Sequence, residues 1–145
     1  MSLRTDVVIK GTLIGKYTVE IEAGNHKIYF DLPKSKGGDD KGSTPVHGVL
    51  ASIAGCIGII GRMLSDRLKI PIENMEIIVK GWYDPAAVAD PRIDATINDI
   101  EVTVRVKSPE PEERIKELIK EVERACFVVQ SIVKERPVKV FVEKI

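Results

Sequence analysis

The sequence predicts an α+β fold, built as one domain over residues 1–145. Two observations support this class. Several short segments alternate apolar and polar residues, as strands do, and longer segments between them carry apolar residues at helical spacing. With 43% hydrophobic and 30% charged residues, the chain has the balance of a globular protein. The predicted order is βββ-α-ββ-α-β, in which sheets cover the helices.

Three strands are predicted in the first third of the chain, at 6–12, 17–22 and 26–32. Gly15 lies between the first two, and Gly24 lies between the second and the third. Tight turns at these places need residues that tolerate positive φ. An antiparallel meander is the simplest arrangement of the three strands.

A polar loop and a long apolar helix follow. The loop covers 33–45, and its acids are expected to bond nearby backbone amides. The helix covers 46–68, with Pro45 suited to its first turn. Its middle is apolar on every side, so we expect it to be buried nearly all round. A second backbone could approach its small residues closely: Ala51, Ser52, Ala54, Gly55, Gly58 and Gly61.

The second half of the chain returns to alternating strands and helices. Strands are predicted at 75–83 and 97–106, and an amphipathic helix at 110–125. A short helical piece covers 127–134, and a last strand covers 138–142. This completes the predicted fold.

Composition excludes several function classes. The net charge is zero, from 22 basic and 22 acidic residues, and no block of like charge predicts a nucleic acid or a membrane as partner. The first ten residues lack the apolar core of a signal peptide, and the apolar stretches are expected to fall short of a membrane span. We therefore expect a cytoplasmic protein.

The two cysteines, Cys56 and Cys126, are too few for a secreted disulfide scaffold. A structural zinc site would need His26, His47 or carboxylates to join them, and no CxxC or HxxxH spacing occurs. Cys56 lies in the apolar helix, where a free cysteine often serves as a small hydrophobe. Cys126 begins a helical piece, where backbone N–H groups favour a thiolate. From the residues alone, a structural and a redox role stay open for both.

Two segments resemble the OsmC/Ohr family. In that family an Asp-x-Pro, a Gly-Gly-x-Asp and a Gly-x-x-Pro loop lead into a small-residue helix that ends in Ala-Gly-Cys. The segment 30–56 carries the corresponding residues: Asp31, Pro33, Gly37, Gly38, Asp40, Gly42, Pro45, Ala51, Ala54, Gly55 and Cys56. The segment 125–143 resembles the second cysteine, helical turn and final strand of the family.

The resemblance implies an OsmC-like fold: an intertwined homodimer in which antiparallel sheets wrap central buried helices. It also implies an antioxidant thiol peroxidase of the stress response, acting on organic hydroperoxides without a metal or an organic cofactor. Cys56 would be the peroxidatic thiol and Cys126 the resolving thiol, and an external dithiol would reduce the disulfide. The alternative is a divergent member with little peroxidase activity, which binds a small hydrophobic or sulfur-containing ligand at the dimer interface. A third interpretation is a structural dimer whose cysteines only pack.

The sequence departs from the family at the group that stabilises the thiolate. Family enzymes use an arginine from the N-terminal strands and a glutamate after the helix-leading proline, but Val46 and His47 follow Pro45 here. His47 could bond the thiolate or act as a base, or it could be an exposed histidine without a role. Arg4 and Arg92 are the candidates for the arginine, and Arg92 is equally a surface charge.

Overall fold

A computed structural model describes residues 3–145 of the chain. The chain divides into two compact units, one up to Val49 and the other from Leu50 onward. The first unit holds a three-stranded sheet and the loop after it. The second unit holds most of a long helix, a two-stranded sheet and two shorter helices. The prediction of a single domain over residues 1–145 stays a prediction.

The sheet of the first unit is the predicted meander. Its strands are β1 (Ile9–Leu13), β2 (Val19–Ala23) and β3 (His26–Phe30), paired antiparallel in the order β1-β2-β3. The turn between β2 and β3 places Gly24 at φ 60°, in the left-handed region that glycine adopts without strain. The expected glycine turn is therefore confirmed.

The loop after β3 is fastened by the buried carboxylate of Asp31. It accepts hydrogen bonds from Thr18 Oγ1 at 2.6 Å, from the Leu32 amide at 2.7 Å and from the Lys41 amide at 3.1 Å. These donors, the Thr18 hydroxyl foremost, hold the pKa of Asp31 below its usual value despite burial. The expectation that a loop acid bonds nearby amides is confirmed at Asp31.

The long helix α1 (Pro45–Leu68) begins with Pro45, as predicted. It ends where Lys69 takes a positive φ of 56° and Pro71 follows. One face is buried, with Ile53, Ile57 and Leu64 in the core. The opposite face is open, with Ile59 66% and Met63 61% exposed. The expectation of burial nearly all round is therefore wrong for one chain, because its second unit covers only one side of the helix.

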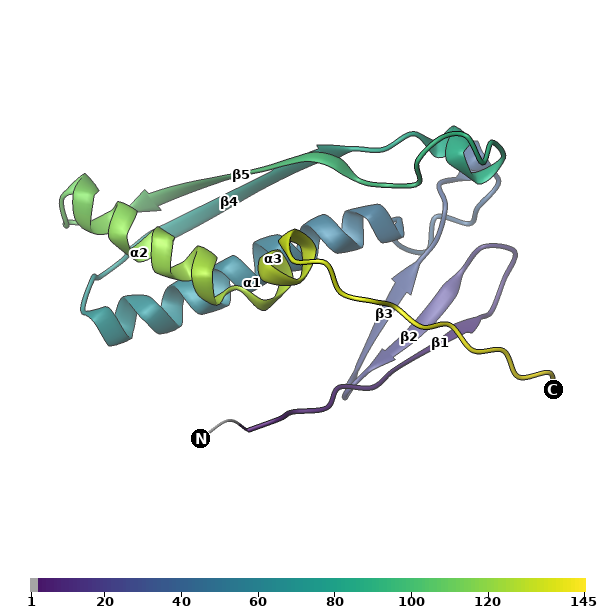
Figure 1. Cartoon of the computed structure of the whole chain (residues 1–145), viewed down its shortest axis with the longest axis horizontal. Helices are drawn as coiled ribbons and strands as arrows, with labels where there is room; N and C mark the ends of the chain where they lie inside the picture. The colour runs from purple at the N-terminus through teal and green to yellow at the C-terminus, as the bar shows by residue number, and fades with distance from the viewer. Residues whose placement is uncertain (1–2) are drawn as a thin grey trace. The chain divides into compact units, whose positions relative to one another are not determined.

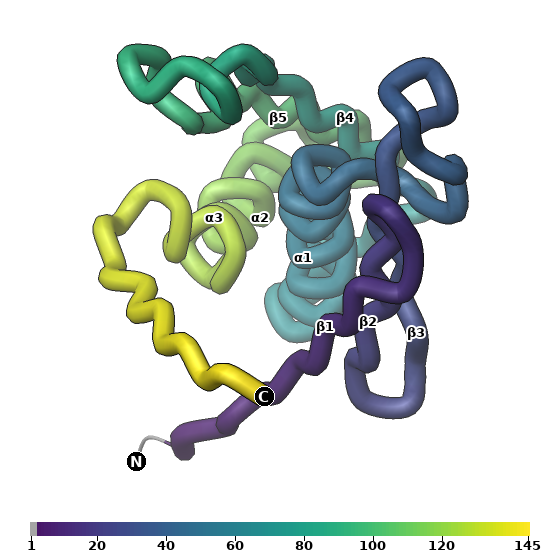
Figure 2. Tube along the Cα trace, turned by 90° about the vertical axis from the view of Figure 1, so that its right-hand side faces the viewer, coloured from purple at the N-terminus to yellow at the C-terminus, as the bar shows by residue number. Residues whose placement is uncertain are grey.

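In the second unit, a β-hairpin and two helices pack against α1. Strands β4 (Asn74–Trp82) and β5 (Asn98–Lys107) pair antiparallel, with a short 3₁₀ turn between them at Pro85–Val88. Helices α2 (Glu112–Ala125) and α3 (Phe127–Val133) follow. Figure 1 shows the hairpin running along α1, and Figure 2 shows α2 and α3 on one side of α1. The buried core comes from α1, the segment before β4, α2 and the joint after α2, and partly buried residues of β4, β5 and α3 pack against it. Its members are Ile53, Ile57, Leu64, Ile70, Ile72, Leu118, Val122 and Cys126.

The predicted last strand at 138–142 is wrong. After α3 the chain runs on without any strand pairing, and Val138, Val140, Phe141 and Val142 are 84–90% exposed. The segment has the alternating valines of a strand. A strand, however, needs hydrogen bonds from a neighbouring backbone, and no other strand among residues 3–145 supplies them.

Helix α1 is also long and apolar enough to cross a membrane, if length and composition alone are considered. The sequence-based expectation that the apolar stretches are too short is thus wrong on length. One such helix is weak evidence for a membrane, because core helices of soluble proteins have the same properties.

Replacing Asp31 with Asn should lower the melting temperature by several degrees at neutral pH, because an amide group cannot accept all three hydrogen bonds. The lowered pKa means that the ionised carboxylate stabilises the folded state. The advantage of the wild type should thus be complete above the unfolded-state pKa, about 3.9, and disappear as the pH falls through the folded-state value. Thermal melts followed by circular dichroism measure this.

The matched control is Asp40→Asn, at an exposed acid in the same loop. Equal melting temperatures for the two variants at neutral pH would show that Asp31 does not fasten the loop.

Candidate active site

Cys56 lies on α1 beside the residues that anchor this helix in the core. Ile53, one helical turn before it, and Ile57, directly after it, are both buried. The cysteine itself is half-buried and packs against the core cluster. It is therefore held by a rigid helix but remains partly accessible, as a thiol that meets a substrate needs to be.

Cys126 lies at the joint between α2 and α3 and is fully buried. It ends α2, where its amide donates to the Glu123 carbonyl at 3.4 Å, and it begins α3, where its carbonyl accepts from the Gln130 amide at 2.9 Å. Val122, one turn earlier, is also fully buried. Both helices thus fix the position of this sulfur in the core.

The two thiols meet, although many residues separate them in the sequence. Both cysteines are free, and their side chains interact by hydrogen bonding. Burial raises the pKa of the Cys126 thiol, and the Cys56 side chain raises it further. Amides of Val129 and Val128 act in the opposite direction but are outweighed. The expected backbone N–H groups are therefore present at Cys126, but they do not make it a ready thiolate.

This geometry gives the two sulfurs different protonation and different accessibility. Cys126 keeps its proton at neutral pH, so its S–H group can donate to the Cys56 sulfur. Cys56 is the more accessible of the two. A pair of this kind can cycle between two thiols and one disulfide.

His47 lies in the first turn of α1, which the Thr44 side chain caps. Its Nδ1 lies 2.8 Å from Thr44 Oγ1, and its amide donates to the same oxygen at 3.4 Å. The Thr44 hydroxyl thus contacts both the backbone amide and the ring of His47. The side chain is exposed. The structure thus gives His47 a capping contact, and its role toward the thiolate stays a prediction.

Arg4 and Arg92 each pair with an acid two residues away. Arg4 Nε lies 2.8 Å from Asp6 Oδ1. Arg92 binds Asp90 with two nitrogens, at 2.9 and 2.8 Å, which raises the pKa of Arg92 and lowers that of Asp90. Among residues 3–145, no hydrogen bond or ion pair joins a basic side chain to either cysteine. The predicted roles of both arginines stay predictions.

Glu123 lies near this site, although the sequence pattern alone does not single it out. It lines an apolar cavity between α1, β5, α2 and α3, although it is charged. Its position, four residues after Ile119 on the apolar side of α2, is the signal that could have found it. Within the described part of the chain, no group of three or more His, Cys, Asp or Glu residues is placed to hold a metal ion.

A family model described as OsmC-like protein matches residues 38–141, which is more than two thirds of the chain. The chain belongs to the OsmC-like protein family. The matched part contains both cysteines and the helices α1, α2 and α3. The resemblance seen in the sequence is therefore confirmed, and the chain is a soluble OsmC-like protein.

Solved structures show the same fold. An OsmC like protein from Mycoplasma pneumoniae matches with a TM-score of 0.79 and 20% identity, over 90% of this chain and 89% of that one. An organic hydroperoxide resistance protein OsmC from Legionella pneumophila matches with 0.61 and 18%, over 91% of each chain. One from Elizabethkingia anophelis matches with 0.64 and 17%, over 90% of each. Identities this low show the fold alone. No curated protein matches the chain.

The contact between the thiols predicts how Cys126 titrates. Replacing Cys56 with Ala should lower the pKa of Cys126, because the hydrogen bond and the charge of Cys56 both raise it. The pKa should stay above that of an ordinary cysteine, since burial remains. NMR titration of the cysteine Cβ in both proteins measures this. An unchanged Cys126 pKa in Cys56→Ala would mean that the sulfurs do not interact.

Proposed function

We propose that this OsmC-like protein is a thiol-dependent reductase of organic hydroperoxides. The observation that carries the proposal is the contact between a partly exposed thiol, Cys56, and a buried thiol of raised pKa, Cys126. Organic hydroperoxide resistance proteins from Legionella pneumophila and Elizabethkingia anophelis share the fold, which supports the proposal at the level of the family. An apolar environment around the pair favours organic hydroperoxides over hydrogen peroxide.

The first step takes place at Cys56. Its thiolate attacks the distal oxygen of the hydroperoxide, so that an S–O bond forms and the O–O bond breaks. The sulfur is oxidised to a sulfenic acid, and the peroxide is reduced to an alcohol after its alkoxide takes up a proton. Cys56 suits this role because it is the more accessible of the two sulfurs.

The second step uses Cys126. Its sulfur attacks the sulfur of the sulfenic acid, an S–S bond forms, and the hydroxide that leaves combines with the Cys126 proton as water. An external dithiol then reduces the disulfide and is itself oxidised. The proposal places the protein in the cytoplasm, where such dithiols keep cysteines reduced.

The Cys56 thiolate needs a hydrogen-bond donor, and the chain offers one in Cys126. Its pKa is raised, so it keeps its S–H at neutral pH next to the Cys56 sulfur. We propose that His47, Arg4 or Arg92 adds a positive charge when substrate binds. The ion pairs of both arginines are exposed, so breaking them costs little.

Rapid mixing of the reduced protein with cumene hydroperoxide tests the proposal. Thiols should be lost at least on the order of a hundredfold faster than from free cysteine, a factor typical of positioned catalytic groups. Peptide mapping should find one disulfide, between Cys56 and Cys126. Hydrogen peroxide should react more slowly than cumene hydroperoxide.

Two variants separate the steps. Cys56→Ser should abolish the reaction, whereas Cys126→Ser should retain the first step and leave a sulfenic acid that dimedone traps on Cys56. Thiol loss no faster than from free cysteine would refute the peroxidase. An unchanged second step in Cys126→Ser would refute the resolving role.

We also propose that the protein works as a homodimer. The open face of α1 carries Ile59 and Met63, both well exposed, together with Gly55. A Cβ at Gly55 would meet nothing within 4 Å, so a second backbone could approach the helix there. The tail at 138–142 is a second apolar segment without cover. Apolar surface of this extent favours a partner, and symmetric pairs are the commonest assembly.

A lysine on the open face of α1 should disrupt the dimer. Ile59→Lys should weaken self-association by about tenfold or more, because a charge would be buried without a partner. The control is Ile78→Lys, a similarly exposed isoleucine on β4, which should leave association unchanged. Sedimentation equilibrium measures both. A wild type that is monomeric at every concentration, or an Ile59→Lys variant that associates normally, would refute the proposal.

A further inference from the structure

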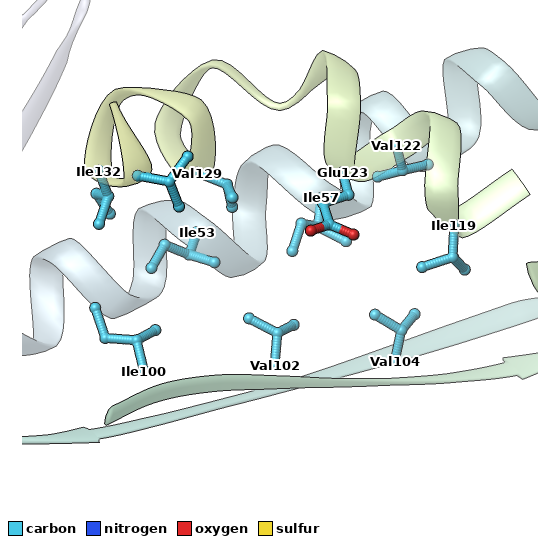
Figure 3. A pocket seen from close by; sticks show the side chains of 11 residues that line it. Ile53, Ile57, Ile100, Val102, Val104, Ile119, Val122, Glu123, Val129 and Ile132 are labelled. Carbon is cyan, nitrogen blue, oxygen red and sulfur yellow. The ribbon is translucent and has the colours of Figure 1, made fainter. Parts of the chain in front are cut away.

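The second unit contains an apolar cavity of about 350 Å³ between α1, β5, α2 and α3. Its walls are branched aliphatic side chains, among them Ile53 and Ile57 of α1, Val102 and Val104 of β5, Ile119 of α2 and Val129 of α3. Figure 3 shows these side chains facing one another across the space. The volume lies at the lower end of the range for small-molecule pockets, about 300–1,000 Å³.

The cavity has one charged wall residue, Glu123. Figure 3 shows its carboxylate oxygens among the aliphatic side chains. The residue is held in place through its backbone, because the Glu123 carbonyl accepts from the Cys126 amide at 3.4 Å and from Gln130 Nε2 at 3.0 Å. These bonds fix the backbone of Glu123 near the end of α2, and its side chain is exposed.

The carboxylate of Glu123 has no ion-pair partner among residues 3–145, in contrast to three other acids of α2. Glu113 pairs with Lys116, Glu117 with Arg114 and Glu121 with Arg124. Glu112, at the start of the helix, also lacks an ion pair in the described part of the chain, but only Glu123 lines the cavity. An unpaired carboxylate beside an apolar wall attracts a cation from solution.

The chemistry of the walls defines the ligand. A carboxylate only accepts hydrogen bonds, and the aliphatic walls offer neither donors nor acceptors. A ligand must therefore bring an apolar body and a donor, and a positively charged donor gains most. We propose that this cavity binds a small aliphatic molecule with a protonated amine, the amine on Glu123 and the hydrocarbon against Ile53, Val102 and Val129.

This proposal goes beyond the peroxide reductase. Neither Cys56 nor Cys126 lines the cavity, so the bound molecule does not occupy the place of a hydroperoxide at the sulfurs. The residues named as its walls all come from the second unit of the chain.

A matched set of three probes tests the proposal: hexylamine, hexan-1-ol and hexanoate, which share one hydrocarbon body. Methyl NMR of the full chain at neutral pH gives both the dissociation constants and the place of binding. We expect shifts at Ile53, Val102 and Val129. Hexylamine should bind about tenfold more tightly than hexanoate, since attraction to Glu123 replaces repulsion, with hexan-1-ol between them.

Two variants isolate the carboxylate. Glu123→Gln should weaken hexylamine about threefold, as expected for an exposed ion pair, and leave hexan-1-ol unchanged. Glu121→Gln removes the same charge from α2 at a residue that does not line the cavity, and should leave both affinities unchanged. Neither substitution changes a core residue.

Three outcomes would overturn the proposal. The first is equal affinity for hexylamine and hexanoate, and the second is an unchanged hexylamine affinity in Glu123→Gln. The third is that the probes cause no shifts at the lining methyl groups. Shifts that depend on protein concentration and not on the probe would count in the same way, because they would show that a second copy of the chain fills the cavity.

Discussion

The packing of α1 against α2 is the interaction on which the rest of the second unit depends. Ile53, Ile57 and Leu64 enter the core from α1, and Leu118 and Val122 enter it from α2. Cys56 is carried on the first helix and Cys126 at the end of the second, so the same contact that buries the aliphatic side chains brings the sulfurs together. Each buried aliphatic residue of this size contributes roughly 1.5–3 kcal/mol, whereas a contact between two thiols is weak. The hydrophobic core therefore positions the sulfur pair.

The environment then makes two identical side chains behave differently. Cys126 is surrounded by hydrocarbon, and burial outweighs the amides at the start of α3. Cys56 is on a surface that solvent reaches. In the proposed peroxide chemistry, the Cys56 sulfur would therefore react first with the oxidant, and the buried Cys126 sulfur would react second. Nothing in the two residues themselves imposes this order.

Much of this fold could be predicted from the sequence, because periodicity records which side of an element is covered. The three-stranded meander, the helix from Pro45 to Leu68 and the strand pair before α2 all follow from local patterns. The tail at 138–142 and the open side of α1 could not be predicted for the single chain. Their apolar residues indicate that something covers them, but a pattern does not say whether the cover comes from the same chain.

The candidate site could be predicted only in part: the pairing of the cysteines could be, but their titration and the role of Glu123 could not. The family motif placed Cys56 and Cys126 together, which spacing alone could not do, since a long separation in sequence says nothing about distance. The pKa of Cys126 depends on the balance between burial and nearby amides, and only coordinates supply that. In the sequence, Glu123 is an ordinary surface acid of an amphipathic helix. The fold places it beside Ile119 and Val129 in the wall of a cavity.

The tail after α3 has a consequence for solubility. Val138, Val140, Phe141 and Val142 form a short run with high β propensity and no pairing in the chain itself, the composition of an aggregation-prone segment. Charged residues surround and interrupt it: Lys134, Glu135, Arg136, Lys139, Glu143 and Lys144. Such gatekeepers oppose the stacking of identical segments from different molecules. The tail is therefore apolar enough to pair with a strand of a partner molecule. Its charged residues are numerous enough to oppose precipitation of chains whose tails are unpaired.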